Sequence, residues 1–234
     1  MPAKLQMVLD HGKYDEVLRI ADVLYGHIDF LEIGYPQMVT YGLEIVSDIH
    51  KAHPDLPLCV DVKVHPGGTG ITRRCFEAGA SIVTVLASAP DPVIKKMVEH
   101  AHEYGGSIMC SIDDPKRLNK RTQEIDSFGV DYVCVSSGFM MEHLYELNKK
   151  KRPSIFQAKP LEFAATVKKN LHHAGLAIGT GINTSNIHEV MALDPAVVLV
   201  GRGIYESAVD KNGLRPASDA VKRERADTLR REMR

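Results

Sequence analysis

Short apolar segments recur about every 25 to 30 residues along this chain, and that repeat restricts its fold more than any other feature. The interval is too long for β-hairpins and fits a strand followed by a helix, repeated many times. Segments such as Ile82–Leu86 and Val197–Val200 are apolar at nearly every position, which is typical of strands covered on both faces of a parallel sheet. The predicted strands are Leu5–Leu9, Ile28–Ile33, Leu58–Val62, Ser81–Leu86, Ser107–Ile112, Asp131–Val135, Leu176–Ile178 and Ala196–Val200.

Helical patterns fill the intervals between these strands. From Asp91 to Tyr104 the apolar residues share one face, and Gly105-Gly106 supplies a stop signal. Repeated β–α units with right-handed crossovers can close into a barrel. An open doubly wound sheet would usually carry a glycine-rich turn after its first strand, whereas this chain reads Leu9-Asp10-His11-Gly12 there. We therefore expect residues 1–234 to form a single domain, a (β/α)8 TIM barrel.

Composition and charge restrict the partners of the chain. With 25% charged residues and a net charge of -1, it has no overall field to attract nucleic acid or an anionic membrane. No segment approaches the ~20 apolar residues of a membrane span, and the N-terminus lacks the pattern of a signal peptide. We expect a cytoplasmic protein with a small-molecule partner. Its cysteines lack C-x-x-C spacing and are predicted to be buried, reduced thiols: Cys59, Cys75, Cys110 and Cys134.

Charged residues stand at the ends of the first three predicted strands, where barrel enzymes carry their active sites. They are Asp10, Glu32, Asp61 and Lys63. A carboxylate within an apolar strand is costly to bury unless it is paired, hydrogen-bonded or bound to a metal. Since side chains alternate along a strand, Asp61 and Lys63 should both point into the barrel. We expect the four side chains to converge there.

Two interpretations of this cluster are open. Glu32 and Asp61 are suited to an oxygen-ligated Mg²⁺ that keeps several waters, with Lys63 placed where negative charge develops on a substrate oxygen. Alternatively, the four groups form a buried ion-pair cluster that only closes the end of the barrel.

Glycines follow the seventh and eighth predicted strands, in the two loops where barrels repeatedly bind phosphate. The first loop carries Gly179, Thr180 and Gly181, and the second carries Gly201 and Arg202. Glycines let the backbone approach an anion closely, and an arginine adds a forked ionic contact. The two loops together predict a site for a phosphorylated substrate.

Several segments resemble the orotidine-5'-phosphate decarboxylase superfamily, and within it the branch of 3-hexulose-6-phosphate synthase and 3-keto-L-gulonate-6-phosphate decarboxylase. The similarity runs over nearly the whole chain. Its segments are Leu5–Asp10, Ile28–Gly34, Asp61–Lys63, Phe76–Ala80, Thr84–Leu86 and Gly201-Arg202.

This resemblance implies a barrel and a homodimer with active sites at the subunit interface. It implies that Glu32 and Asp61 hold Mg²⁺ and that Lys63 stabilises a 1,2-enediolate formed by aldol cleavage or decarboxylation. It further implies that the segments Gly179–Gly181 and Gly201-Arg202 bind phosphate.

The chain departs from the family pattern at two places. The motif D-x-K-x-x-D, whose last acid reaches into the partner's site, here ends in Pro66, which cannot ionise. His65, whose charge can change near neutral pH, is a candidate substitute as proton carrier, against the alternative of an ordinary loop histidine. The decarboxylase branch carries a histidine after strand six, where this chain has Ser136 and Ser137.

The sequence therefore favours a carbon–carbon lyase: a Mg²⁺-dependent aldolase of the 3-hexulose-6-phosphate synthase type, acting on a phosphorylated keto-sugar through an enediolate. Its proposed catalytic residues are Asp10, Asp61, Lys63 and His65. The alternatives are the corresponding decarboxylase, a pentulose-phosphate epimerase or isomerase, and a phosphosugar-binding protein that has lost catalysis. An epimerase of the familiar kind needs metal-binding histidines, and His11 and His65 do not form the usual H-x-H arrangement.

One long connection, from Ser136 to Gly175, contains the charged run Lys149–Pro153. The simplest interpretation is a solvated helix end, and the alternative is a mobile lid over the site.

Overall fold

The computed structural model describes residues 2–65, 67–112, 118–136, 160–179, 181–210 and 213–234. Eight parallel strands close into a barrel in the order β1 to β8, each paired with its sequence neighbours and β8 with β1. The predicted (β/α)8 barrel is thereby confirmed. The strands are β1 Lys4–Leu9, β2 Phe30–Ile33, β3 Leu58–Val64, β4 Ile82–Leu86, β5 Ser107–Ser111, β6 Tyr132–Ser136, β7 Gly175–Gly179 and β8 Val197–Val200.

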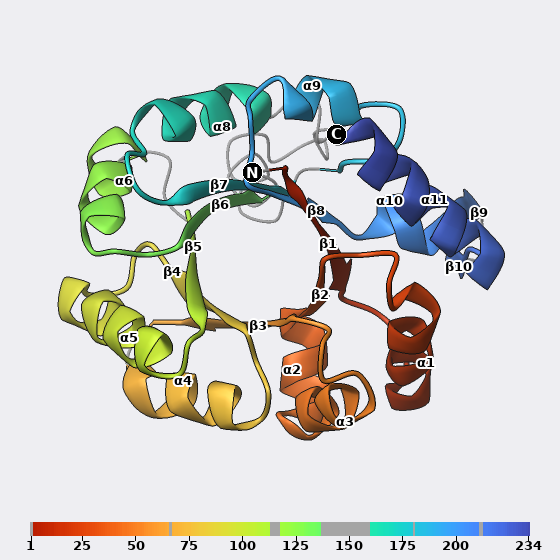
Figure 1. Cartoon of the computed structure of the whole chain (residues 1–234), viewed down its shortest axis with the longest axis horizontal. Coiled ribbons are helices and arrows are strands. Elements are labelled where there is room, and N and C mark those ends of the chain that lie inside the picture. Colours follow the sequence, from red (N-terminus) through yellow and green to blue (C-terminus); the bar gives the residue numbers. More distant parts are fainter. Residues whose placement is uncertain (1, 66, 113–117, 137–159, 180, 211–212) are drawn as a thin grey trace.

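Helices surround this ring of strands (Figure 1). They are α1 Tyr14–Leu24, α2 Tyr35–Tyr41, α3 Glu44–Ala52, α4 Gly68–Glu77, α5 Asp91–Glu103, α6 Leu118–Ser127, α8 Pro160–Lys169, α9 Ile187–Met191, α10 Arg202–Tyr205 and α11 Asp219–Glu232. The predicted helix from Asp91 is confirmed as α5. A small antiparallel pair, β9 Glu206–Asp210 and β10 Gly213–Pro216, lies between α10 and α11 and was not predicted.

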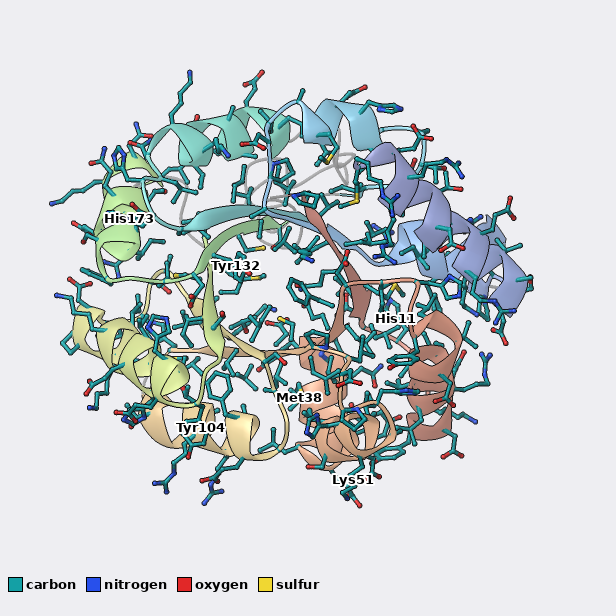
Figure 2. All side chains as sticks on the ribbon, viewed as in Figure 1. His11, Met38, Lys51, Tyr104, Tyr132 and His173 are labelled. Carbon is teal, nitrogen blue, oxygen red and sulfur yellow. The ribbon has the colours of Figure 1, made fainter. Side chains whose placement is uncertain are left out.

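The apolar core has two parts, because each strand buries one face inside the barrel and the other under the helices. Inside the barrel, Cys59, Met109 and Leu199 belong to one cluster, against which Tyr132 packs. Figure 2 labels Tyr132 within the ring of strands. The larger cluster joins the outer strand faces to the helices. All four cysteines are free and buried, as predicted.

Polar side chains replace apolar ones toward one end of the interior. Gln6, Glu32, Asp61 and Thr84 are all buried, although they lie on strands that are otherwise almost entirely apolar. This end of the barrel is formed by the carboxyl ends of the strands, where the sequence predicts the active site. No helix in the described ranges is long and apolar enough to cross a membrane.

Candidate active site

Strand β3 positions the most closely connected part of the site. Asp61 is 5% exposed, and its carboxylate accepts a hydrogen bond from the Lys63 ammonium. The Thr84 hydroxyl donates to Asp61 Oδ1 at 2.7 Å, and the Tyr35 backbone N–H donates to Asp61 Oδ2 at 3.3 Å. These contacts fix the carboxylate from three neighbouring strands or their ends, as expected for a preorganised group.

The Lys63 side chain is 42% exposed, and its ammonium lies 5.5 Å from the centre of the Tyr35 ring. Burial acts to lower the pKa of Lys63, but the nearby charges of Asp61, Glu32 and Asp10 outweigh it and raise the pKa overall. A lysine held protonated in this way is suited to stabilising negative charge on a substrate oxygen.

Glu32 lies beside this pair, from strand β2. Its Oε2 accepts a hydrogen bond from Gln6 Nε2 at 2.5 Å. Burial raises the pKa of Glu32 from its ordinary value of 4.5 to about 8, and the charges of Asp61 and Asp10 act in the same direction. The buried carboxyls thus outnumber the one nearby lysine, and a bound cation would favour their ionised form.

Asp10 follows strand β1 and lies against the start of α2. A Cβ atom added to Gly34 would come within 2.1 Å of Asp10 Oδ1 and 2.7 Å of the Leu9 carbonyl oxygen. The close approach therefore requires glycine at position 34. Asp10 keeps exposed surface, but the protein atoms packed around its carboxyl and the charge of Asp61 raise its pKa, whereas His11, Lys63 and Arg202 act to lower it. The four charged groups predicted to converge thus lie within electrostatic reach of one another.

The two glycine-containing loops after β7 and β8 pack directly on each other. A Cβ atom on Gly203 would lie 2.3 Å from the Ile182 carbonyl oxygen and 3.1 Å from the Asn183 Cβ. Gly181 has a φ of 68°, a conformation that favours glycine. Gly201 and the exposed Arg202 begin α10, so both stand at the same end of the barrel as the carboxylates.

Side chains hold both of these loops in place. Asn186 Oδ1 accepts from the Asn183 backbone N–H at 2.9 Å, and Asn186 Nδ2 donates to the Gly181 carbonyl oxygen at 3.2 Å. Arg225 of α11 donates to the carbonyl oxygens of Gly203, at 3.4 Å, and Glu206. The loop backbone is therefore fixed before any ligand arrives, which lowers the entropy lost on binding.

Other predicted residues contribute less to this geometry. His65 is exposed just beyond the end of β3. Ser136 ends β6. Thr180, Pro66, Ser137 and the segment Lys149–Pro153 lie outside the described residues, so the lid hypothesis stays a prediction.

Two polar residues of the site were missed in the sequence. Gln6 and Thr84 both contact the predicted carboxylates, yet they are uncharged and sit singly in apolar strands. The alternation of side chains along a strand could have identified both residues. Gln6 falls on the same strand face as Asp10, and Thr84 falls on the same face as Ile82, which points into the barrel interior.

Glu32 and Asp61 are the residues that fit a metal ion. Among the described residues no group of three or more histidine, cysteine or acidic side chains is placed to hold a metal. Two carboxylates nevertheless suffice for Mg²⁺, which usually keeps several waters and takes further ligands from its substrate.

A profile for the "Orotidine 5'-phosphate decarboxylase / HUMPS family" matches residues 3–215. The chain belongs to this family. A relative from Bacillus subtilis, named 3-hexulose-6-phosphate synthase, is 34% identical over 208 residues, which cover 89% of this chain and 93% of the relative. The family resemblance read from the motifs is confirmed.

Solved structures support the same barrel fold. A 3-hexulose-6-phosphate synthase from Salmonella typhimurium has a TM-score of 0.80 at 23% identity, covering 98% of both chains. A 3-keto-L-gulonate-6-phosphate decarboxylase from Vibrio cholerae has a TM-score of 0.79 at 20% identity, covering 100% of this chain and 98% of the other.

This member of the orotidine 5'-phosphate decarboxylase / HUMPS family thus presents two complementary features at one barrel end. The carboxylates can bind a cation, and the Lys63 ammonium can stabilise negative charge on an oxygen atom. The glycine-containing loops with Arg202 can bind an anion.

Proposed function

We propose that this chain is a Mg²⁺-dependent aldolase of the 3-hexulose-6-phosphate synthase type, a carbon–carbon lyase. The observation that carries this proposal is the contact of Lys63 with Asp61 beside Glu32, at the same barrel end as the start of α10 at Gly201 and Arg202. Its substrate is a phosphorylated keto-sugar, consistent with the name of the Bacillus subtilis relative.

The reaction follows from the chemistry of a 3-hexulose 6-phosphate. Cleavage of the C1–C2 bond releases C1 as formaldehyde, as the C1 hydroxyl gives up its proton. The bonding electrons stay on the remaining five carbons as an enediolate, and protonation of that enediolate gives a pentulose 5-phosphate. The synthetic direction reverses these steps. Lys63 donates to the oxygen on which negative charge develops.

Proton transfer requires a group that can change charge. We propose Asp10 and His65 for this role, and Asp61 holds the Lys63 ammonium in place. The last acid of the family's D-x-K-x-x-D motif reaches into the active site of the partner subunit. This chain has Pro66 at that position, which carries no acid, so His65 would take over the proton transfer.

Glu32 and Asp61 would hold the Mg²⁺ ion. When bound, this ion would supply positive charge next to the substrate oxygens. The raised pKa of Glu32 supports this assignment, because mutual repulsion of nearby carboxylates is relieved by a divalent cation.

The substrate phosphate would bind to Gly179, Thr180, Gly181, Gly201 and Arg202. The contact of Gly203 with Ile182 supports a joint site, because it holds the two loops together. We further propose a homodimer. A cytoplasmic location stays a prediction from composition.

The residues at the end of strand β6 favour aldol cleavage over decarboxylation. This chain has Ser136 and Ser137 there, where the decarboxylase branch is expected to carry a histidine. Both reactions share the enediolate and differ in the one-carbon product, which is formaldehyde or carbon dioxide.

Exchange of the C1 protons of a pentulose 5-phosphate in D₂O tests the proposal, since both directions pass through the enediolate. NMR should show Mg²⁺-dependent exchange that EDTA and Lys63→Ala abolish. Added formaldehyde should then give a hexulose phosphate. Binding of the sugar phosphate without exchange would contradict enediolate chemistry, and exchange that survives Lys63→Ala would assign it to another group.

A further inference from the structure

Strand β3 departs from regular pairing where it carries the proposed catalytic residues. Val60 pairs with Val83 of β4, but the next matched pair is Val64 with Val85. Three residues of β3, Asp61 to Lys63, thus face the single residue Thr84. This is an irregularity of the β-bulge kind, which re-aims side chains near active sites.

Lys63 lies within this irregularity and has a φ of 44°, in the left-handed region. For a residue other than glycine this conformation costs about 1 kcal/mol or more, and it persists only where surrounding contacts hold it. The Lys63 backbone N–H donates to the Thr84 side-chain oxygen at 3.0 Å. A side chain has therefore replaced the usual backbone partner.

The Thr84 hydroxyl connects both halves of the Asp61–Lys63 pair. It accepts from the Lys63 N–H at 3.0 Å and donates its one proton to Asp61 Oδ1 at 2.7 Å. Thr84 is 3% exposed. A hydroxyl can fill both roles at once because it has one donor and two acceptor positions.

A valine at this position would keep the shape of Thr84 but remove both contacts. The Lys63 N–H and Asp61 Oδ1 would then each lose a buried partner, which is unfavourable for a polar group. The left-handed conformation of Lys63 would lose the hydrogen bond that holds it, and the ammonium would move relative to Asp61.

We propose that Thr84 is a positioning residue, which sets the places of the Lys63 ammonium and the Asp61 carboxylate through its two hydrogen bonds. It acts through these two residues rather than on the substrate. The positioning itself is a property of the fold, whereas its catalytic consequence rests on the proposed function.

The test compares Thr84→Val and Thr84→Ala, which both lack the hydroxyl, with Thr84→Ser, which keeps it. Thr72→Val is the matched control, because Thr72 is also buried and donates its hydroxyl proton, at 2.7 Å, to the Gly68 carbonyl oxygen within α4. Circular dichroism and thermal melting identify the folded variants.

The first measurement needs no catalysis. Lysines of the full-length protein are labelled with an amine-reactive ester at fixed pH, and mass spectrometry gives the rate at Lys63 relative to Lys51, whose side chain is 75% exposed. Loss of the hydroxyl should free the ammonium from Asp61 and raise the relative rate several-fold in the Val and Ala variants. Thr84→Ser and Thr72→Val should match the wild type.

The second measurement is the C1 exchange assay. We expect kcat to fall ~10–100-fold in Thr84→Val with little change in KM, because the proposed phosphate loops are untouched, and Thr84→Ser to recover most of it. Unchanged Lys63 labelling in folded Thr84→Val or Thr84→Ala would overturn the positioning role. If the wild type shows no exchange but the labelling changes as expected, the proposed function fails and the positioning role stands.

Discussion

Glu32 lies in the barrel interior, hydrogen-bonded to Gln6 and close to two other carboxyls, those of Asp61 and Asp10. With its pKa raised to about 8, the folded protein keeps this proton at pH values where the unfolded chain has lost it. The folded state then binds more protons than the unfolded state between pH 4.5 and about 8. The contribution of Glu32 to the stability of the metal-free protein must therefore fall with rising pH in this window.

We predict that the metal-free protein loses stability from this group as pH rises from 4.5 to about 8, by at most about 1.4 kcal/mol per pH unit. Glu32→Gln should remove this component, and Mg²⁺ should stabilise the wild type at pH 8 more than the variant. Urea denaturation with EDTA or Mg²⁺ measures both effects. Glu224→Gln, at an exposed position of α11, is the control. Identical pH profiles for wild type and Glu32→Gln would contradict the prediction.

Charge decided which site residues the sequence revealed. Glu32, Asp61 and Lys63 stand out because burying a charge in an apolar strand needs a specific reason. Thr84 and Gln6 went unnoticed because single neutral polar residues are common in strands. The left-handed conformation of Lys63 depends on the pairing between β3 and β4, so no pattern within β3 alone could reveal it.

At the scale of elements, the strands were predicted with their ends within two residues, because eight apolar segments carry a strong signal. The β9–β10 pair was missed. Its strands follow the short helix α10 and carry no comparable apolar run. Contacts between side chains of one element and the backbone of another could not be predicted from the sequence either. Asp126 is an example.

Asp126, near the end of α6, joins that helix to the segment before β7. Its carboxylate accepts the backbone N–H groups of His172 at 2.9 Å, His173 at 3.1 Å and Ala174 at 2.8 Å. Burial acts to raise the pKa of Asp126, but these three donors outweigh it and lower the pKa overall. The resulting stability is present above the ordinary carboxyl pKa and is lost as pH falls through the lowered one.

We predict that Asp126→Asn destabilises the protein by ~1–3 kcal/mol at neutral pH, because an amide cannot accept all three bonds and leaves at least one backbone N–H group facing the buried side chain without its acceptor. The difference from wild type should shrink under acidic conditions, where Asp126 itself becomes protonated. Denaturant unfolding at several pH values measures it. Asp194→Asn, at a side chain that is 92% exposed, should change stability little. A pH-independent difference would argue against a role for the ionised carboxylate.

For the whole molecule, the barrel followed from the repeat, but the outer surface carries a feature that the repeat does not explain. Val39 on α2 is 69% exposed, Tyr35 at the start of α2 is 46% exposed, and Ile71 on α4 is 43% exposed. These helices follow the neighbouring strands β2 and β3 (Figure 1). Tyr35 also lies beside Lys63, so a partner bound over α2 and α4 would border the proposed active site.

We predict that this face joins two copies of the chain, because exposed apolar side chains on adjacent elements are typical of association surfaces. Sedimentation equilibrium should give twice the 25.9 kDa chain mass for the wild type. Val39→Lys should shift it toward the monomer and reduce C1 exchange. Tyr25→Lys is the control: Tyr25 is also 45% exposed, but it stands at the end of α1 and stacks on His53, and neither residue lies on α2 or α4. A wild-type monomer, or a Val39→Lys variant that remains fully dimeric, would refute this interface.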